Sequence, residues 1–323
     1  MGPPRFELGS PAPKERLESL FFPQTAIQYS KLRNDFINWF KEKGVKESTY
    51  SNYVSILDRT IKFVIIQSPE QLKEIYNSLD KNKSNFAKGF RNLLNFMVEK
   101  KLISKAVAEE FKAAIPIPKS GTDKKIPEDE AILKANEHFR KNLNEIYYLV
   151  FQLLVFSGLR LEHLCDMLNN FDPANLEIFE DRGFARYNMS GIGSRNKEAF
   201  ECYMPSWLGK KLLHLYKKNN GFRVDYQYAK KVINYKYVKR VEVGGDVVET
   251  TVTVSSKYIR KWTNRFLKKM KVPAAERNFI LGRVSEIGKS VEFHNYLDLR
   301  EDADEEYARI VDKFPIKEVN HED

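Results

Sequence analysis

Residues 144–164, NEIYYLVFQLLVFSGLRLEHL, contain the longest apolar run near the middle of the chain. The run extends from Tyr147 to Leu159 and is interrupted only by Gln152 and Ser157. It is too short to cross a bilayer, and its apolar character on every side predicts a helix buried within a folded domain. A glycine ends this helix, and an arginine follows two residues later.

Arg160 is that arginine and the first candidate site residue. A guanidinium at the end of a buried helix needs an anionic partner, and its planar fork suits a phosphate. Glu162, Asp166 or another acid is the alternative partner, which this segment taken alone favours.

The sequence as a whole divides into two predicted folded parts, and this helix belongs to the second. Apolar residues recur at helical spacing between residues 21 and 114, which predicts a small helical bundle. Helical patterns resume after residue 130 and are broken by two predicted β-hairpins, over 183–204 and around Gly244–Gly245. The predicted fold class is mainly α with small β-hairpins (α+β). The expected boundaries are a flexible arm at 1–20, a helical domain at 21–114, a linker at 115–130 and a second domain at 131–323.

Composition excludes several classes of protein. The chain has 323 residues and 37.8 kDa, more than one compact core usually organises, and its 42% apolar content is that of a globular protein. Cys165 and Cys202 are its only cysteines, which excludes a disulfide framework or a four-cysteine zinc site, and its five histidines are scattered. We therefore expect no metal. The N-terminus lacks a signal-peptide pattern, so we expect a cytoplasmic protein with no membrane partner.

Positive charge is concentrated in one block. The net charge is +10 with a pI near 9.2, and residues 210–271 hold 17 lysines and arginines against 4 acids. Such a cluster neutralises phosphates, and the interleaved tyrosines supply further hydrogen bonds to a nucleic-acid backbone. A solvated lysine-rich face is the alternative interpretation.

Two later segments add candidate residues. In SSKYIRKWTNRFLKKM, Lys257 and Arg260 lie three apart and hence on one helical face. Cations near a helix start are disfavoured by the dipole, so we expect an anion there. In ILGRVSEIGKSVEFHNYLDL, Arg283 precedes Tyr296. A tyrosine hydroxyl is a poor nucleophile unless cations stabilise its anion or a base removes its proton.

These residues resemble the tyrosine recombinases, also called phage-type integrases, across both predicted domains. That family carries an arginine in a T/S-G-L-R box, a lysine on a β-hairpin, an H-x-x-R or K-x-x-R pair, a later His/Trp position and then a tyrosine. The pattern is most similar to integrases of archaeal viruses and plasmids, where lysine replaces the first histidine and arginine the later one. The matching positions are Arg160 in SGLR, Lys197 in RNKEAF, Lys257 and Arg260 in KYIR, Arg283 in LGR and Tyr296 in HNYLDL.

The resemblance implies a type IB-like reaction that uses no metal, ATP or other cofactor. Tyr296 would attack the scissile phosphate and form a 3′-phosphotyrosyl link, and the released 5′-hydroxyl would attack the partner strand's link. Arg160 and Arg260 would hold the non-bridging oxygens, Lys257 and Arg283 would add transition-state hydrogen bonds, and Lys197 would protonate the leaving oxygen.

This sequence departs from the family's pattern near the tyrosine. Arg283 and Tyr296 are 13 positions apart, a few more than is usual, so Phe293 falls nearer the usual position. Phenylalanine has no hydroxyl that could attack a phosphate, so Tyr296 is preferred as the nucleophile. Tyr307 is the competing candidate for that role. His294 is either a base or a surface residue.

Two further positions stay open. Arg195 is an alternative to Lys197 on the hairpin, and His163, with Glu162 beside it, replaces the acidic residue usually found three positions beyond the first arginine.

The resemblance further implies a partner and an assembly. We expect a helical core-binding domain and a catalytic domain to close as a clamp around double-stranded DNA at attachment sites, with a homotetramer on DNA held through the segment after Tyr296. That segment packs on its own domain in the alternative interpretation. Integration of a mobile element is the expected function. A type IB-like topoisomerase and a non-catalytic DNA-binding protein are the alternatives.

Phe6-Glu7-Leu8 suggests a target for integration. The tripeptide back-translates to TTY-GAR-CTN, whose reverse complement can contain GTTCRAA, the T-loop sequence of a tRNA gene. We interpret this as an attachment site that overlaps the coding sequence, copied antisense from a tRNA gene. A coincidental peptide or a cloning remnant is the alternative.

Overall fold

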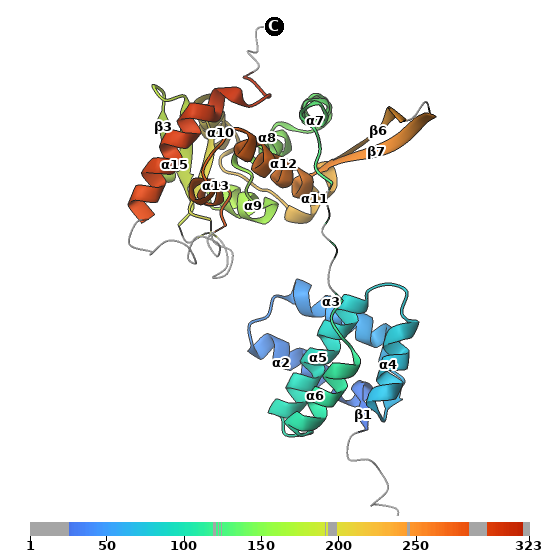
Figure 1. Ribbon diagram of the computed structural model, residues 1–323. Helices are drawn as coiled ribbons and strands as arrows, with labels where there is room; N and C mark the ends of the chain where they lie inside the picture. The colour runs from blue at the N-terminus through green and yellow to red at the C-terminus, as the bar shows by residue number, and fades with distance from the viewer. Residues whose placement is uncertain are drawn as a thin grey trace, which may run out of the picture. The chain divides into compact units, whose positions relative to one another are not determined.

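The computed structural model describes residues 26–118, 121, 123, 125–190, 192, 199–243, 246–283 and 296–318 (Figure 1). The chain divides into two compact units, Met1–Thr122 and Asp123–Asp323, at a point inside the segment that the sequence predicts as a linker. Helices dominate both units and the sheets are small and antiparallel, so the predicted α+β class is confirmed. Among the described residues, no helix has the length and apolar character needed to cross a membrane.

The first unit is a helical bundle. Helix α5 (Lys83–Glu99) buries Phe90, Leu93, Leu94 and Met97, the inner face that the sequence predicts. Ser68 caps the preceding helix by accepting a hydrogen bond from the Gln71 amide, as its position before a proline predicts. The elements are β1 (Ile27–Gln28), α2 (Tyr29–Glu42), α3 (Glu47–Ile61), β2 (Ile65–Ile66), α4 (Pro69–Ser78), α5 (Lys83–Glu99) and α6 (Lys105–Ala114).

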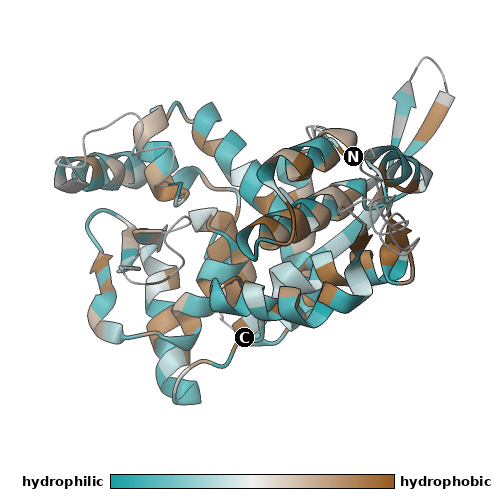
Figure 2. Cartoon of the chain, turned by 90° about the horizontal axis from the view of Figure 1, so that it is seen from below, coloured by the Kyte–Doolittle hydropathy of each residue, from teal (hydrophilic) through white to brown (hydrophobic). Residues whose placement is uncertain are grey.

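The second unit is built around α8 (Glu145–Ser157), the apolar helix of the central segment. Every residue from 148 to 157 is buried, so the predicted fully buried helix is confirmed. The surrounding helices alternate apolar and polar residues (Figure 2), because only one side of each contacts the core. They are α7 (Asp129–Asn142), α9 (Leu161–Asn169), α10 (Ser206–Asn219), α11 (Tyr226–Val232), α12 (Ser256–Lys269), α13 (Ala274–Ile280) and α15 (Tyr296–Ile310).

A three-stranded antiparallel sheet packs beside these helices. β4 (Phe184–Asn188) and β5 (Glu201–Pro205) form the predicted hairpin, and β3 (Leu176–Phe179), which the sequence did not predict, pairs with the other edge of β4. All five residues of β5 are buried, and α8 and α13 pack against it. The turn residues 191 and 193–198 lie outside the described part of the chain.

A two-stranded ribbon completes the second unit. β6 (Asn234–Val243) and β7 (Asp246–Ser255) pair along their full length, as the flanks of Gly244–Gly245 predict. Its base packs on α7, where Tyr235 stacks on His138 with ring centroids 4.7 Å apart. Farther out, Val238 and Val247 are 56% and 65% exposed.

Candidate active site

The turn between α8 and α9 fixes the backbone around Arg160. Gly158 ends α8 with φ +61°, and the Ser157 hydroxyl accepts a hydrogen bond from the Leu159 amide at 3.2 Å. A Cβ on Gly158 would lie 2.5 Å from the Leu281 side chain, so only glycine fits both the conformation and the space. This sharp turn makes Arg160 the N-cap residue of α9.

Two predicted site arginines converge on one short backbone segment. The Arg160 Nη1 donates to the Gly282 carbonyl at 3.1 Å, and the Arg260 Nη1 donates to the Leu281 carbonyl at 2.7 Å. Arg260 also donates to the Gly158 carbonyl, which ties its guanidinium to the turn before Arg160. The contacts of Arg160 with Gly282 and of Arg260 with Gly158 bring together residues that lie 122 and 102 positions apart in the sequence.

Arg283 lies immediately after that segment. Its amide donates to the Asn278 carbonyl at 2.9 Å, which closes the turn that ends α13, and its side chain is half-buried. Gly282 has φ +60°, and a Cβ there would lie 2.8 Å from Ala199. The close packing of this glycine holds the backbone of Arg283 beside the two arginine contacts.

Lys257 makes a different contact. It lies in the first turn of α12, and its Nζ donates to the Asp123 carboxylate at 2.6 Å. The Lys261 ammonium lies 3.2 Å from the same carboxylate. The hydrogen bond from Lys257 is the main cause that holds the pKa of Asp123 well below its usual range, and the same bond raises the pKa of Lys257. Asp123 supplies the anion that the cations at this helix start led us to expect.

The sequence contains a signal for Asp123 that the prediction missed. Asp123 is the only acid in the run KSGTDKK, residues 119–125, so a local ion pair with some lysine was foreseeable. That Lys257 is the partner was not foreseeable, because 134 positions separate the two residues.

Tyr296 is the first residue of α15, and its side chain lies outside the described part of the structure. Lys197, its alternative Arg195, and His294 also lie outside the described residues. Of the predicted site, the structure therefore brings together Arg160, Arg260 and the backbone of Arg283.

Tyr307, the competing nucleophile, is a core residue. Its side chain is fully buried, and its hydroxyl donates to the Phe156 carbonyl at 3.2 Å. Burial raises its pKa well above the ordinary value. A phosphate in solution does not reach this hydroxyl. His163 is buried as well, with 2% of its surface exposed, whereas the neighbouring Glu162 is half-buried.

A buried polar cluster joins α15 to the sheet, and the sequence did not predict it. The Asp304 carboxylate accepts hydrogen bonds from Arg186 on β4 and from the Tyr203 hydroxyl on β5, the latter at 2.8 Å. The second arm of Arg186 donates to Glu177 on β3 at 2.9 Å. The cluster therefore ties the helix that begins at Tyr296 to all three strands.

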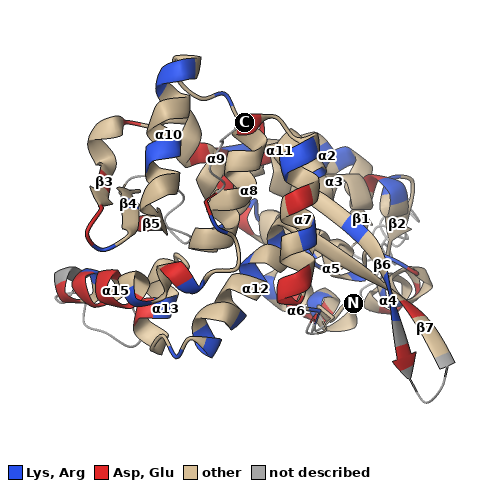
Figure 3. Ribbon diagram, turned by 90° about the horizontal axis from the view of Figure 1, so that it is seen from above, with Lys and Arg blue, Asp and Glu red and all other residues tan. Residues whose placement is uncertain are grey.

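Charge is unevenly distributed over the second unit. Lysines and arginines lie along α10 and α12, whereas α15 is predominantly acidic (Figure 3). The lysines and arginines of these two helices fall within residues 210–271, the block that the sequence indicates. An acidic α15 is suited to packing against protein rather than against a phosphate backbone.

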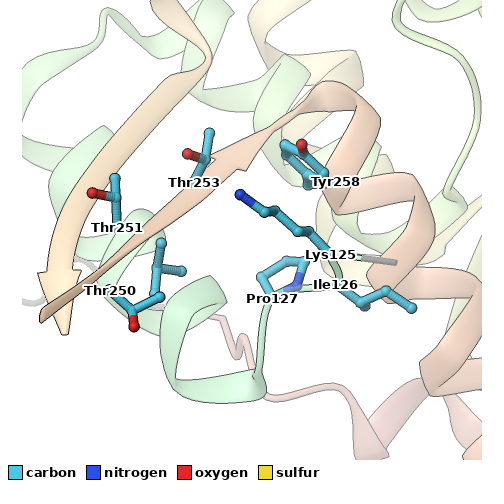
Figure 4. A pocket seen from close by; sticks show the side chains of 8 residues that line it. Lys125, Ile126, Pro127, Thr250, Thr251, Thr253 and Tyr258 are labelled. Carbon is cyan, nitrogen blue, oxygen red and sulfur yellow. The ribbon is translucent and has the colours of Figure 1, made fainter. Parts of the chain in front are cut away.

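A pocket of about 240 Å³ lies between the linker and the ribbon (Figure 4). Lys125 and Tyr258 line it together with threonines of β7, and none of the convergent arginines does. The pocket is therefore separate from the candidate active site.

Comparisons with known proteins assign the family. Functionally characterised proteins gave no match. A solved structure described as the crystal structure of XerA recombinase shares 15% sequence identity with this chain, covers 87% of it and 97% of its own length, and has a TM-score of 0.32. A likeness at that level adds nothing to the assignment. Residues 124–313, more than half of the chain, match the family model of the archaeal phage integrases. The chain therefore belongs to the archaeal phage integrase family and is a tyrosine recombinase.

Proposed function

We propose that this protein is a site-specific integrase that inserts a mobile element into DNA through Tyr296. The observation that carries the proposal is the convergence of Arg160 and Arg260 on the carbonyls of residues 281–282, directly before Arg283. Phosphoryl transfer needs mainly positioning and charge stabilisation, and guanidinium groups gathered at one point supply both.

In the proposed reaction, the Tyr296 oxygen attacks the scissile phosphorus and the bond to the 5′-oxygen breaks. The phosphate stays on the enzyme as a 3′-phosphotyrosyl ester, and the tyrosine proton leaves to solvent or a base. Lys197 protonates the departing 5′-oxygen. Arg160 and Arg260 hold the non-bridging oxygens, and Lys257 and Arg283 stabilise the charge that develops. Attack by a 5′-hydroxyl from a second strand reverses these steps and restores Tyr296.

We further propose how the two units divide the work. The helical domain, residues 21–114, would act as the core-binding domain, and the 115–130 linker would let both domains close around a duplex. The basic block at 210–271 would neutralise backbone phosphates, which makes binding salt-dependent. Four copies on two attachment sites, acting in the cytoplasm, would form the recombining complex.

The target proposed from Phe6-Glu7-Leu8 is a tRNA gene. Support comes from the coding possibilities of these three residues alone, which lie outside the described structure. Sequencing the coding region against the host's tRNA genes tests the idea. Codons here that pair with no host tRNA gene would remove the target and leave the rest of the proposal intact.

Covalent trapping tests the nucleophile. A nicked attachment-site duplex lets the short 5′ fragment diffuse away after attack, so the phosphotyrosyl adduct accumulates. We expect an adduct with the wild type and with Tyr307→Phe, in EDTA and without ATP, and none with Tyr296→Phe. Retention of the adduct by Tyr296→Phe would overturn the assignment.

A plasmid assay separates the two enzymatic functions. Two plasmids that carry attachment sites should give recombinant junctions if the protein is an integrase. Relaxed supercoils without junctions would identify a topoisomerase that uses the same chemistry. Neither product, with DNA binding retained, would identify a non-catalytic binding protein.

A further inference from the structure

The polar cluster beside α15 contains one carboxylate oxygen and two guanidinium nitrogens that are buried without a hydrogen-bond partner among the described residues: Glu201 Oε2, Arg186 Nε and Arg300 Nε. Glu201 begins β5 and is 1% exposed, and its Oε2 has no hydrogen-bond partner among the described residues. The Nε of Arg300, on α15, is likewise buried without a partner in the described part of the chain. A buried polar atom left unsatisfied is costly. Arg186 already binds Asp304 and Glu177 through its other nitrogens, so Arg300 is the cation of this cluster that has no carboxylate partner among the described residues.

One hydrogen bond links the two elements that carry Glu201 and Arg300. Tyr203 and Glu201 lie two residues apart on β5, on the same face and about 7 Å apart along the strand. Asp304 and Arg300 lie four residues apart on α15, on one side and about 6 Å apart along the helix axis. The Tyr203 hydroxyl binds Asp304, and Arg300 lies close enough to Glu201 to lower the pKa of its carboxyl.

The electrostatics of Glu201 agree with that placement. Burial raises its pKa to about 7, and attraction by Arg186 on β4 and by Arg300 on α15 offsets part of the rise. Asp304 on α15 and Glu177 on β3 raise it further, and the Tyr203 hydroxyl beside it on β5 stays protonated. An ionised Glu201 is therefore unfavourable until a cation comes within hydrogen-bonding distance.

Arg300 also lies one helical turn after Tyr296. A contact made by Arg300 therefore fixes the first turn of α15, whereas Asp304 fixes the second. We propose that Glu201 and Arg300 are positioning residues that pair to set the first turn of α15, and with it Tyr296, for attack on the phosphate. The inference rests on the proposed function, because it takes Tyr296 as the nucleophile.

Single-turnover adduct formation on the nicked duplex tests the pair in the full-length protein. Glu201→Gln and Arg300→Gln should each slow adduct formation by about 10-fold to about 100-fold, the range expected for a misplaced reacting group, with unchanged DNA affinity. Because the two residues act as one contact, the double variant should be no slower than the slower single variant. Arg300→Lys, which keeps the charge, should recover part of the rate. Glu305→Gln, at an exposed position of the same helix, is the matched control and should react as the wild type does.

The pH profile supplies a readout that a merely structural role would not move. The wild-type rate should rise between about pH 6 and about pH 8 as Glu201 ionises and draws Arg300 to it, and Glu201→Gln should lose that rise. Wild-type rates in both single variants, additive losses in the double variant, or an unchanged profile in Glu201→Gln would each overturn the pair.

The nucleophile variant keeps the two proposals distinguishable. An adduct with Tyr296→Phe would show that the proposed function is wrong, whatever the pair does. No adduct with Tyr296→Phe, combined with wild-type rates in Glu201→Gln and Arg300→Gln, would reject the positioning pair alone.

Discussion

The Arg160 guanidinium donates a hydrogen bond to the Gly282 carbonyl across 122 positions of sequence. This contact joins the turn after α8 to the turn after α13, the two places where the chain presents its predicted site arginines. The orientation of Arg160 is therefore fixed by the backbone that precedes Arg283.

Arg160→Lys tests whether the fork of this side chain matters beyond its charge. Lysine keeps one positive charge but loses the planar fork, so it holds either the Gly282 carbonyl or a phosphate oxygen in proper geometry. Adduct formation should fall by about 10²-fold to about 10³-fold, with DNA affinity nearly unchanged. Arg309→Lys is the control. A wild-type rate in Arg160→Lys would show that charge alone suffices.

Gly158→Ala should destabilise the second unit. Alanine at φ +61° is strained, and its Cβ would meet Leu281 at 2.5 Å and Thr263 at 2.9 Å. The expected loss is about 1–3 kcal/mol in the free energy of unfolding, measured by urea denaturation. Gly121→Ala, where no atom lies within 4 Å of the added Cβ, should be nearly neutral. Equal stabilities for both variants would contradict this account of the turn.

Stability should decrease as the pH rises from about 4.5 to about 7. The pKa of Glu201 is raised from 4.5 to about 7 in the folded protein, so folding favours the protonated carboxyl. The unfolded chain therefore loses this proton first, and the resulting loss, on the order of 3 kcal/mol, develops between pH 4.5 and about pH 7. Urea unfolding of the wild type and Glu201→Gln across this range measures it. A difference between the two proteins that does not change with pH would refute the assignment.

Asp123→Asn should increase DNA affinity. Its carboxylate neutralises Lys257 and Lys261 in the DNA-free protein, and a phosphate must displace it to reach them. Removal of the carboxylate should raise affinity a few-fold in fluorescence anisotropy and make the salt dependence steeper. Glu306→Gln, which releases Arg309 on α15, should leave affinity unchanged. Weaker binding by Asp123→Asn would mean that the carboxylate orders the site rather than blocks it.

The helices were predictable because each has local sequence signals, namely the spacing of its apolar residues and the residues at its ends. Residues 144–164 combine an apolar run, a terminal glycine and an arginine, and the structure places a buried helix, a left-handed turn and a convergent guanidinium there. The ribbon around Gly244–Gly245 followed from turn chemistry in the same way. Short-range patterns therefore sufficed for these elements.

The buried cluster was not predictable, for a physical reason. Arg186 and Asp304 are 118 positions apart, and each alone looks like an ordinary surface charge. β3 was not predicted because three of its four residues are only partly buried, the fourth is exposed, and the strand shows no strong alternation. Long-range polar pairing is decided by how the elements pack, which no single segment of sequence records.

The β6–β7 ribbon has a consequence for local stability. Near its base the ribbon stacks on α7 through Tyr235, whereas Val238 and Val247 are exposed and the ion pairs of Lys239 and Arg240 lie at the surface. Strand pairs without packing partners open more easily than those in a core. The ribbon should therefore fray from its outer end inward while α8 and the sheet stay folded. Every other amide of β6 is hydrogen-bonded to β7, and these amides should exchange hydrogen more slowly the nearer they lie to Tyr235.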